Sequence, residues 1–437
     1  MKIKKFAEQN LIELVFYANA LLRIFMGPLT IALAAFYLTK EEMGFYYGFI
    51  STLSAQQLME MGLGYNLTRR ISKNGRFNGG KTRVKIELNP SDMGYVGLAL
   101  TWHLMVGIFM LFIIGPIGFL SFSTLDGTEA DWELAWIFSV IASATLVATN
   151  PLPIIVEASG ERLYVAKMRF FAMVASLVGY YVCMISGHGL AALGTTACIT
   201  CLIQYSTCKK KLYINYSLML RFLKNIGMLR EYFHDNWRIS VVWGTGFFYW
   251  SGISLTILHV YGLEIAGLYG FSLAVLTAIS SLSISRFKSK ISLYSNKLTY
   301  ESKSEVARSF EKDMLIYFLL YISGVVIFSL IINFDRFSVI QDRLLEKDVF
   351  TCLSIVVLLS QLTSATGDFS RLTGGEPFFT LSLIANILLP ISVLFHSVVF
   401  IDFEETMLVY IFFQIALMTY SVFLYKKLFG AKFEDKI

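Results

Sequence analysis

Charged side chains are scarce in this chain. Aspartate, glutamate, lysine and arginine together make up 16% of its 437 residues, whereas hydrophobic residues make up 56%. An average soluble domain carries about 25% charged residues, so this chain has too little polar surface to cover a globule in water. The composition excludes an ordinary soluble protein and predicts a chain whose solvent is the lipid bilayer.

Cysteine is also scarce, with five residues in all. Each of the five lies in or beside an apolar segment, and Cys198 and Cys201 are three residues apart within one run of bilayer length. We interpret them as small packing residues, because a buried free cysteine behaves as a small hydrophobic side chain. Their spacing gives no reason to expect a metal or redox site.

Apolar stretches of bilayer length run through the whole chain. A hydrocarbon core of about 30 Å needs about 20 helical residues, and twelve windows of that length occur. They cover residues 12–37, 42–66, 93–122, 133–156, 166–186, 189–207, 237–260, 266–284, 312–334, 348–366, 376–400 and 405–425. The sequence therefore predicts an all-α membrane protein of twelve transmembrane helices with both termini on the same side.

The basic residues determine the orientation, because Lys and Arg are retained on the cytoplasmic side during insertion. With the N-terminus in the cytoplasm, 32 of the 37 lysines and arginines fall in cytoplasmic segments. This distribution also accounts for the net charge of +6 without a nucleic-acid partner. The outside loops are short, the longest running over 335–347, which excludes a sizeable extracytoplasmic catalytic domain.

The twelve windows divide into six and six. Between the sixth and the seventh, apolar residues recur at helical spacing with basic residues among them, which predicts an amphipathic linker helix on the inner membrane surface. These apolar positions are Met219, Phe222, Ile226, Leu229 and Phe233. We predict an N-terminal six-helix bundle over 1–207, the linker over 208–236, and a C-terminal six-helix bundle over 237–437.

A short internal repeat supports this division. Residues 41–46 and 264–269 share the pattern E-x-x-G-aromatic/apolar-Y. Each copy follows the first hairpin of its six-span half and opens a helix that returns to a basic cytoplasmic loop. Repeats of this kind are typical of transporters whose two halves enclose a central site.

The same region carries a resemblance to a known family. The run over 38–46, then Met61-Gly62-Leu63-Gly64 and the basic pair Arg69-Arg70, resembles the start of the Wzx-type polysaccharide flippases of the multidrug/oligosaccharidyl-lipid/polysaccharide exporter superfamily. The resemblance implies two six-helix bundles related by a pseudo-two-fold, V-shaped around a central cavity. It also implies a monomer in the bacterial inner membrane, with both termini in the cytoplasm.

The implied cargo is a polyprenyl-pyrophosphate-linked oligosaccharide repeat unit, flipped from the cytoplasmic to the outer leaflet by alternating access for O-antigen or capsule assembly. Membrane lipids would surround the protein, and a polysaccharide polymerase and a chain-length regulator would be its partners. The sequence contains no G-x-S-x-G and no H-E-x-x-H motif. We therefore expect a transporter rather than an enzyme, with no cofactor, driven by an ion gradient or by consumption of the cargo.

Arg23 lies about twelve residues into the first predicted span, roughly 18 Å deep at 1.5 Å per residue. A charge at that depth normally faces the interior of the bundle and has a partner. We assign Arg23 and Glu60 to substrate binding, with the guanidinium facing the pyrophosphate or an acidic sugar. A structural ion pair between these two residues is the alternative.

Further polar positions are candidates for function. His103 in the third span is a candidate proton-coupling group, and a hydrogen-bonded packing residue is the alternative. Asp368 and Arg371, at the inner end of the tenth span, are candidates for contact with the cargo near the cytoplasmic mouth. They would otherwise cap the helix.

Breaks in the helices suggest hinges. Pro151 and Pro153 interrupt the fourth span and free backbone carbonyls that need other partners. Gly62 and Gly64 would let helices approach closely or let the second span bend. We predict hinge roles for all four positions, with close packing as the alternative for the glycines.

Two other functions fit part of this pattern. A cation-coupled drug or metabolite antiporter of the same superfamily would need a membrane-embedded carboxylate in the first bundle, where this chain has Arg23. A membrane polysaccharide polymerase would need a large outside loop, which the sequence lacks. The flippase is therefore the main hypothesis and the antiporter is the alternative.

Overall fold

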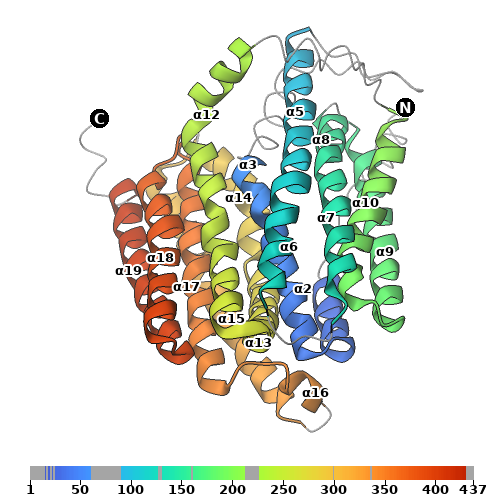
Figure 1. Cartoon of the computed structure of the whole chain (residues 1–437). Helices are drawn as coiled ribbons and strands as arrows, with labels where there is room; N and C mark the ends of the chain where they lie inside the picture. The colour runs from blue at the N-terminus through green and yellow to red at the C-terminus, as the bar shows by residue number, and fades with distance from the viewer. Residues whose placement is uncertain are drawn as a thin grey trace. The chain divides into compact units, whose positions relative to one another are not determined.

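The computed structural model describes residues 25–60, 90–125, 130–158, 161–211, 226–298, 300–334 and 337–429, together with positions 15, 18, 19 and 22 of the first predicted span (Figure 1). All regular elements in these ranges are helices. Contacts between Cα atoms divide the chain into two compact units. The first unit comprises residues 1–38 and 49–244, and the second comprises 39–48 and 245–437.

The first unit contains most of the N-terminal helices. Its elements are the helix Phe25–Tyr37, the end of α2 (Lys40–Leu53), η1 (Ser54–Gln56), α3 (Gln57–Glu60), α5 (Pro90–Phe109), the π-helical turn η2 (Met110–Ile114), α6 (Gly115–Ser123), α7 (Trp132–Thr149), α8 (Pro151–Ala158), α9 (Arg162–Ile185), η3 (Gly189–Ala191), α10 (Ala192–Cys208) and most of α12 (Ile226–Phe247).

The second unit contains the start of α2 and the C-terminal helices. These are the π-helical turn η4 (Phe248–Gly252), α13 (Ile253–Ser283), α14 (Ser285–Lys297), α15 (Lys303–Ile332), α16 (Ser338–Gln341), α17 (Lys347–Arg371), α18 (Phe379–Phe400) and α19 (Phe403–Phe429). The domains predicted from the sequence, with boundaries at residues 207 and 237, place α2 wholly in the N-terminal bundle. The contacts in the structure instead group the first residues of α2 with the C-terminal helices. The predicted domain boundaries stay a prediction.

Nine helices of the described residues are long and apolar enough to cross a membrane. One of them, Trp237–Ser283, contains two of the predicted windows, and its backbone leaves helical geometry at Gly262 with φ 83° and ψ 179°. A left-handed φ of this kind favours glycine, so Gly262 separates two spans. The two remaining windows are the first two, whose described parts are Phe25–Tyr37 and residues 40–60.

The outer surface of the helices is apolar. Side chains such as Phe112 and Leu134 are 73% and 81% exposed. Large apolar side chains exposed along whole helices would be unfavourable in water and are expected where lipid surrounds the protein. The predicted fold class, an all-α membrane protein, is confirmed.

The expected linker is only partly described. Residues 212–225 lie outside the described residues, and residues 226–236 belong to α12, which continues to Phe247. Ile226 and Phe233 of the predicted linker therefore share one continuous helix with the following span. A separate surface helix over the whole of 208–236 stays a prediction.

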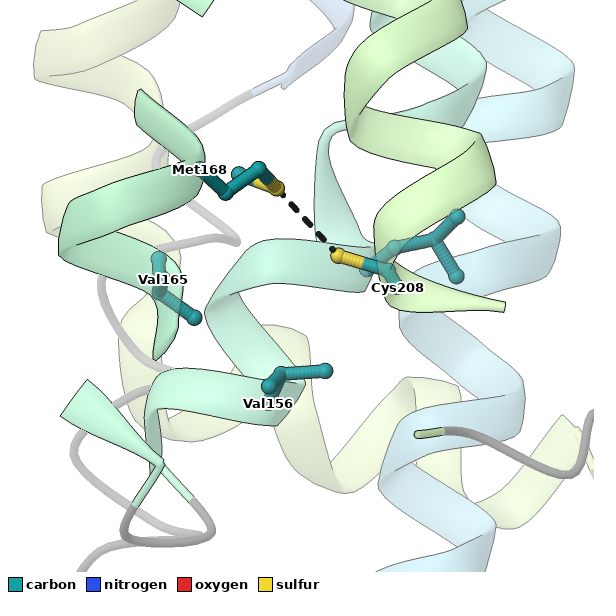
Figure 2. Packing of buried hydrophobic residues seen from close by; sticks show 5 residues of the cluster. Val156, Val165, Met168 and Cys208 are labelled. Atoms are coloured by element: carbon teal, nitrogen blue, oxygen red, sulfur yellow. Dashed lines mark hydrogen bonds between the residues drawn. The ribbon is translucent and has the colours of Figure 1, made fainter. Parts of the chain in front are cut away.

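A cluster of buried apolar side chains joins three helices of the first unit. Val156 of α8, Val165 and Met168 of α9 and Cys208 of α10 are buried against one another (Figure 2). Cys208 Sγ lies 3.7 Å from Met168 Sδ. Cys208 thus packs as a small hydrophobic residue, as its sequence context predicts.

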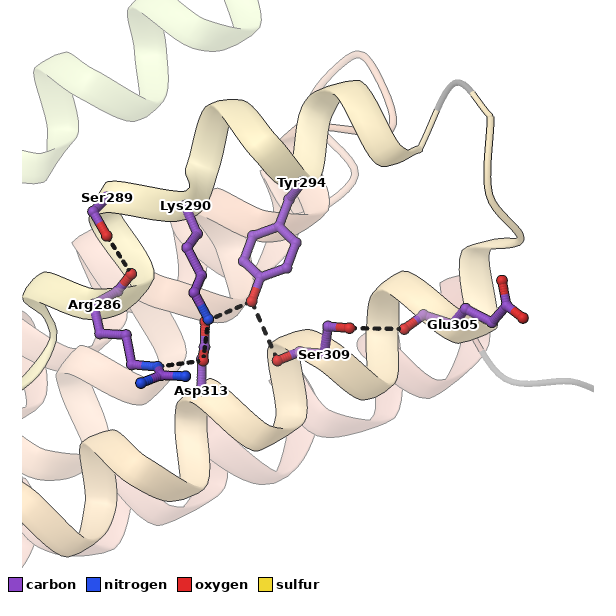
Figure 3. A network of polar contacts seen from close by, with 7 residues as sticks. All are labelled: Arg286, Ser289, Lys290, Tyr294, Glu305, Ser309 and Asp313. Carbon is purple, nitrogen blue, oxygen red and sulfur yellow. Dashed lines mark hydrogen bonds and ion pairs between the residues drawn. The ribbon is translucent and has the colours of Figure 1, made fainter.

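A polar network holds α14 on α15 in the second unit (Figure 3). Asp313 is 3% exposed, and its Oδ1 accepts hydrogen bonds from Arg286 Nε at 2.9 Å and Lys290 Nζ at 2.8 Å. Tyr294 Oη donates to Asp313 Oδ2 at 2.6 Å. Burial of the phenol raises the pKa of Tyr294, and its hydrogen bond to Asp313 raises it further. The phenol therefore stays protonated and keeps donating at neutral pH.

Candidate functional site

The sequence-predicted site residues are distributed over both units. Arg23, Gly62 and Gly64 lie outside the described residues, so their predicted roles stay predictions. Glu60 and His103 belong to the first unit, and Asp368 and Arg371 belong to the second. The candidates in the described part of the chain therefore form one group in each unit.

A cavity of about 330 Å³ lies within the first unit, among the helix Phe25–Tyr37, α9 and α10. This volume is at the lower end of the range that binds small organic molecules, about 300–1,000 Å³. Part of its lining is apolar and comes from the first of these helices and α9. The apolar lining residues are Met26, Met168, Ala172, Met173, Leu177 and Tyr180.

Polar groups line the remainder of the cavity. They are Thr30, Arg169, Ser176, Thr196, Thr200 and Gln204. The hydroxyl groups form a chain across α9 and α10, in which Ser176 Oγ lies 2.8 Å from Thr200 Oγ1, and Thr200 Oγ1 donates to Thr196 O at 2.7 Å. Hydroxyls with this arrangement can also accept a hydrogen bond from a bound molecule.

Arg169 supplies the charge at the cavity. Its Nη2 lies 2.8 Å from Glu157 Oε2, and the two side chains are 37% and 28% exposed. The cavity therefore combines an apolar wall, a row of hydroxyls and an ion pair. In the sequence, Arg169 is one of many basic residues in the segments predicted to be cytoplasmic, and nothing there distinguishes it as a cavity residue.

The predicted break in the fourth span occurs between α7 and α8. Proline at 151 and 153 cannot donate to the carbonyls of Val147 and Thr149, four residues earlier. Asn150 N donates to Val147 O at 3.1 Å, and Gln204 Nε2 of α10 donates to Thr149 O at 3.0 Å. Both freed carbonyls thus have partners, and one partner is a residue that lines the cavity.

Glu60 lies beside His103, a contact that the sequence analysis did not predict. His103 Nε2 lies 3.8 Å from Glu60 Oε1, and the His103 side chain is fully buried, whereas that of Glu60 is 31% exposed. His103 Nδ1 lies 2.8 Å from Ala99 O. The structure therefore places together two residues that were predicted to have separate roles, in substrate binding and in proton coupling.

Asp368 and Arg371 also lie together. Arg371 Nη1 donates to Asp368 Oδ1 at 2.7 Å, and Arg371 Nε lies 3.0 Å from both carboxylate oxygens of Glu376. Glu376 was absent from the sequence candidates, and its side chain is 3% exposed. The three charges close the loop after α17, in which Gly374 and Gly375 have φ of 100° and 69°. Contacts of this kind are expected if Asp368 and Arg371 cap the end of α17, which is the alternative to cargo binding.

One further sequence pattern bears on the expectation of no cofactor. Residues 75–82, from Gly75 to Thr82, match G-x-x-x-x-G-K-[ST]. The pattern indicates a phosphate-binding loop only where it connects a strand to a helix of a nucleotide-binding domain. The segment 61–89 that contains it lies outside the described residues. A cofactor-free protein stays the prediction.

Comparison with known proteins finds solved structures alone, since no family model and no curated protein matches the chain. One similar structure is described as the outward-facing conformation of a multidrug resistance MATE family transporter of the MOP superfamily. It has a TM-score of 0.56 and 11% sequence identity, and 96% of each chain is covered.

Two further structures are similar over nearly the whole chain. The MATE multidrug transporter DinF-BH in complex with rhodamine 6G gives a TM-score of 0.57 and 13% identity, covering 96% of this chain and 95% of that chain. A MOP superfamily transporter from Pyrococcus furiosus gives 0.50 and 12% identity, again covering 96% and 95%. The chain therefore has the twelve-helix, two-lobe fold of MATE transporters.

Proposed function

We propose that this protein is a secondary-active transporter that moves a small amphipathic organic molecule across a membrane by cation-coupled antiport. The observation that carries the proposal is the agreement of its fold with MATE transporters over 95% or more of both chains. Fold alone does not define a substrate. The cavity of the first unit supplies the argument for the class of cargo.

The lining of that cavity suits an amphipathic cargo. Met26, Met173 and Leu177 offer an adaptable apolar wall, because methionine fits irregular shapes. The Ser176–Thr200 hydroxyl pair and the Arg169–Glu157 ion pair offer hydrogen bonds to the polar end of a molecule. One of the similar structures is described as a complex with rhodamine 6G, so this dye is a reasonable first probe.

Reconstitution into proteoliposomes tests this proposal. We expect rhodamine 6G to move against its concentration gradient when a pH or sodium gradient is imposed. Leu177→Trp, which fills part of the cavity, should lower the transport rate by about tenfold or more, because the cargo and the indole cannot share the space. Val178→Trp is the matched control. Val178 is the next residue of α9, its side chain is 57% exposed, and it does not line the cavity.

The outcomes of this experiment separate cleanly. Equal loss in both tryptophan variants would mean that the cavity does not bind the cargo. Absence of gradient-driven movement of rhodamine 6G and of a panel of other amphipathic cations and anions would contradict the antiporter. Protein amount and thermal unfolding temperature, measured for each variant, would reveal any loss that reflects misfolding.

A polysaccharide flippase is the second candidate, and one observation favours it. Residues 38–46, which open α2, carry the pattern that resembles the Wzx-type flippases. In this proposal Arg23 and Glu60 bind the lipid-linked cargo, Asp368 and Arg371 contact it at the cytoplasmic mouth, and the helix breaks at Pro151 and Pro153 and at Gly62 and Gly64 act as hinges. A polymerase and a chain-length regulator would be its partners in the inner membrane.

Deletion of the gene in the native host tests the flippase directly. Loss of surface polysaccharide, with its lipid-linked repeat unit accumulating in the cytoplasmic leaflet, is the result expected of a flippase. Repeat units that reach the outer leaflet without being polymerised would instead indicate a polymerase. An unchanged surface polysaccharide would leave the antiporter as the function of this protein.

A further inference from the structure

We infer that His103 and Glu60 form a single proton-binding site in the first unit, and that the proton bound there is the coupling ion of transport. The second part rests on the proposed function, whereas the first does not. The site joins Glu60 of α3 to His103 of α5. The hydrogen bond of His103, its burial and the position of its second nitrogen beside Glu60 support it.

The hydrogen bond to Ala99 determines which nitrogen of His103 carries its permanent hydrogen. Nδ1 lies 2.8 Å from Ala99 O, and a backbone carbonyl can only accept a hydrogen bond. Nδ1 must therefore be the donor in both the neutral and the charged ring. The second nitrogen, Nε2, is the one that gains or loses a proton.

Nε2 is buried and faces a carboxylate. It has no hydrogen-bond partner among the described residues, and the nearest acidic oxygen is Glu60 Oε1 at 3.8 Å. Without a proton between them, the ring presents a lone pair to a group that can also only accept. A buried polar atom in this position is unfavourable, and one added proton converts the pair into a donor and an acceptor.

The two side chains differ in exposure, which gives the proton an order of transfer. Glu60 is 31% exposed and His103 is fully buried. A proton would therefore bind the carboxylate first and pass to Nε2, with the N–H bond forming as the carboxyl O–H bond breaks. The separation of 3.8 Å exceeds a hydrogen bond, so proton binding should draw Glu60 toward the ring.

The neighbouring residues connect this event to the backbone. Trp102 Nε1, next to His103 on α5, donates to the carbonyl of Met59, next to Glu60 on α3, at 2.7 Å. Occupancy of the proton site therefore acts on two helices that are already joined at adjacent residues. A change in their spacing is a direct means of linking proton binding to a conformational change.

Other charged groups on the helices that pack against α5 are accounted for. On α7, Glu133 lies in the exposed first turn, and on α8, Glu157 pairs with Arg169 at 2.8 Å. Asp92 lies at the start of α5 itself, about three helical turns from the ring. The turns η1 and η2 carry no charged residue. Within the described part of the chain, Glu60 is thus the acidic group that faces the ring.

Histidine-selective ¹⁵N NMR of the whole protein in nanodiscs tests the site without any transport. The chain has five histidines, and His103→Asn identifies the His103 signals. Asparagine can still donate to Ala99 O, so this variant removes the titrating nitrogen while keeping the helix contact. His188→Asn is the matched control, because His188 is exposed in the same unit.

We expect the His103 Nε2 signal to change when the ring gains a proton, and Glu60→Gln to reduce that change, because the carboxylate is the acidic group beside Nε2. An Nε2 signal that does not respond to added acid, or a response that Glu60→Gln does not alter, would overturn the inference. Retention of the Nδ1–H signal throughout would confirm the assigned tautomer.

The role in coupling is tested in the same proteoliposomes that test transport. With a pH gradient imposed, His103→Asn should abolish accumulation of rhodamine 6G against its gradient but preserve exchange of the dye down its gradient. His188→Asn should leave both unchanged. Uphill transport that survives in His103→Asn would refute coupling at this site. Titration of His103 in a protein that moves no cargo would instead contradict the proposed function and leave the proton site standing.

Discussion

Gly267 of α13 packs so closely on Gly44 of α2 that a Cβ atom added at Gly267 would lie 3.0 Å from the Gly44 nitrogen. Gly44 is also close to the backbone of α13, since a Cβ atom added there would lie 2.9 Å from Leu263 Cα. Lys40 Nζ and Glu264 Oε1 form an ion pair at 2.7 Å beside it. Both glycines are the fourth residue of the repeated E-x-x-G pattern, so the two copies of the repeat contact each other within the second unit.

Alanine at either repeat glycine should destabilise the protein, because the nearest atoms are backbone atoms that cannot move aside. We expect Gly44→Ala and Gly267→Ala each to cost about 1–3 kcal/mol, seen as a lower unfolding temperature of the purified protein. Gly367→Ala on α17 is the control, since a Cβ atom there would meet nothing within 4 Å. Equal unfolding temperatures in all three variants would contradict the close packing.

Gln204→Leu should destabilise the first unit by removing the donor to Thr149 O. In a membrane protein such a bond contributes about 1 kcal/mol. Pro153→Ala restores an N–H four residues after Thr149, so it should make Gln204→Leu nearly neutral in the double variant. Additive effects of the two substitutions on the unfolding temperature would show that Gln204 stabilises the protein in some other way.

Asp313→Ala should detach α14 from α15, because it leaves Lys290 and Arg286 without their shared carboxylate. Removing one partner of a buried ion pair costs about 3–5 kcal/mol, and the effect here should lie below that range because Arg286 is 54% exposed. Faster limited proteolysis between α14 and α15 would report the detachment. Glu305→Gln, an exposed change on the first turn of α15, is the control.

The same network should be insensitive to pH from neutral to about pH 9. The raised pKa of Tyr294 means that the folded state favours the protonated phenol. Its contribution is therefore complete below the unfolded-state pKa of about 10 and is lost only as the pH rises through the higher folded-state value. A fall in the proteolytic protection of α14 between about pH 7 and about pH 9 that Tyr294→Phe abolishes would contradict this assignment.

Arg371→Lys should lower stability rather than cargo affinity, because lysine cannot contact Asp368 and both oxygens of Glu376 at once. We expect a lower unfolding temperature and unchanged binding of rhodamine 6G. Weaker binding of the dye at an unchanged unfolding temperature would instead support the substrate-binding role predicted for Asp368 and Arg371. Arg343→Lys, in the loop before α17, is the control for the loss of a guanidinium.

Arg23 gives a test that separates binding of an anion from structural pairing. We expect Arg23→Lys to retain part of the activity and Arg23→Ala to retain little, at an unchanged protein level, because the charge survives in the first variant alone. Surface polysaccharide and transport of rhodamine 6G are the two activities to measure. Full activity of Arg23→Ala in both would remove Arg23 from the mechanism.

Local sequence was sufficient to predict the membrane class, the apolar windows and the break before Pro151. These follow from the length of an apolar helix that crosses about 30 Å and from the missing N–H of proline, neither of which depends on distant residues. Glu60, His103, Gly44 and the repeat around Glu264 were also recognisable as unusual positions in apolar surroundings.

Which of these positions meet depends on how the helices pack. His103 faces Glu60, Gly267 packs on Gly44, and Gln204 donates to the carbonyl that Pro153 frees. These pairs could not be predicted, because a span surrounded by lipid is apolar on every side and its hydrophobic pattern does not fix its rotation toward its neighbours. The partners lie 43 to 223 residues apart in the chain, and only the packed helices bring them together.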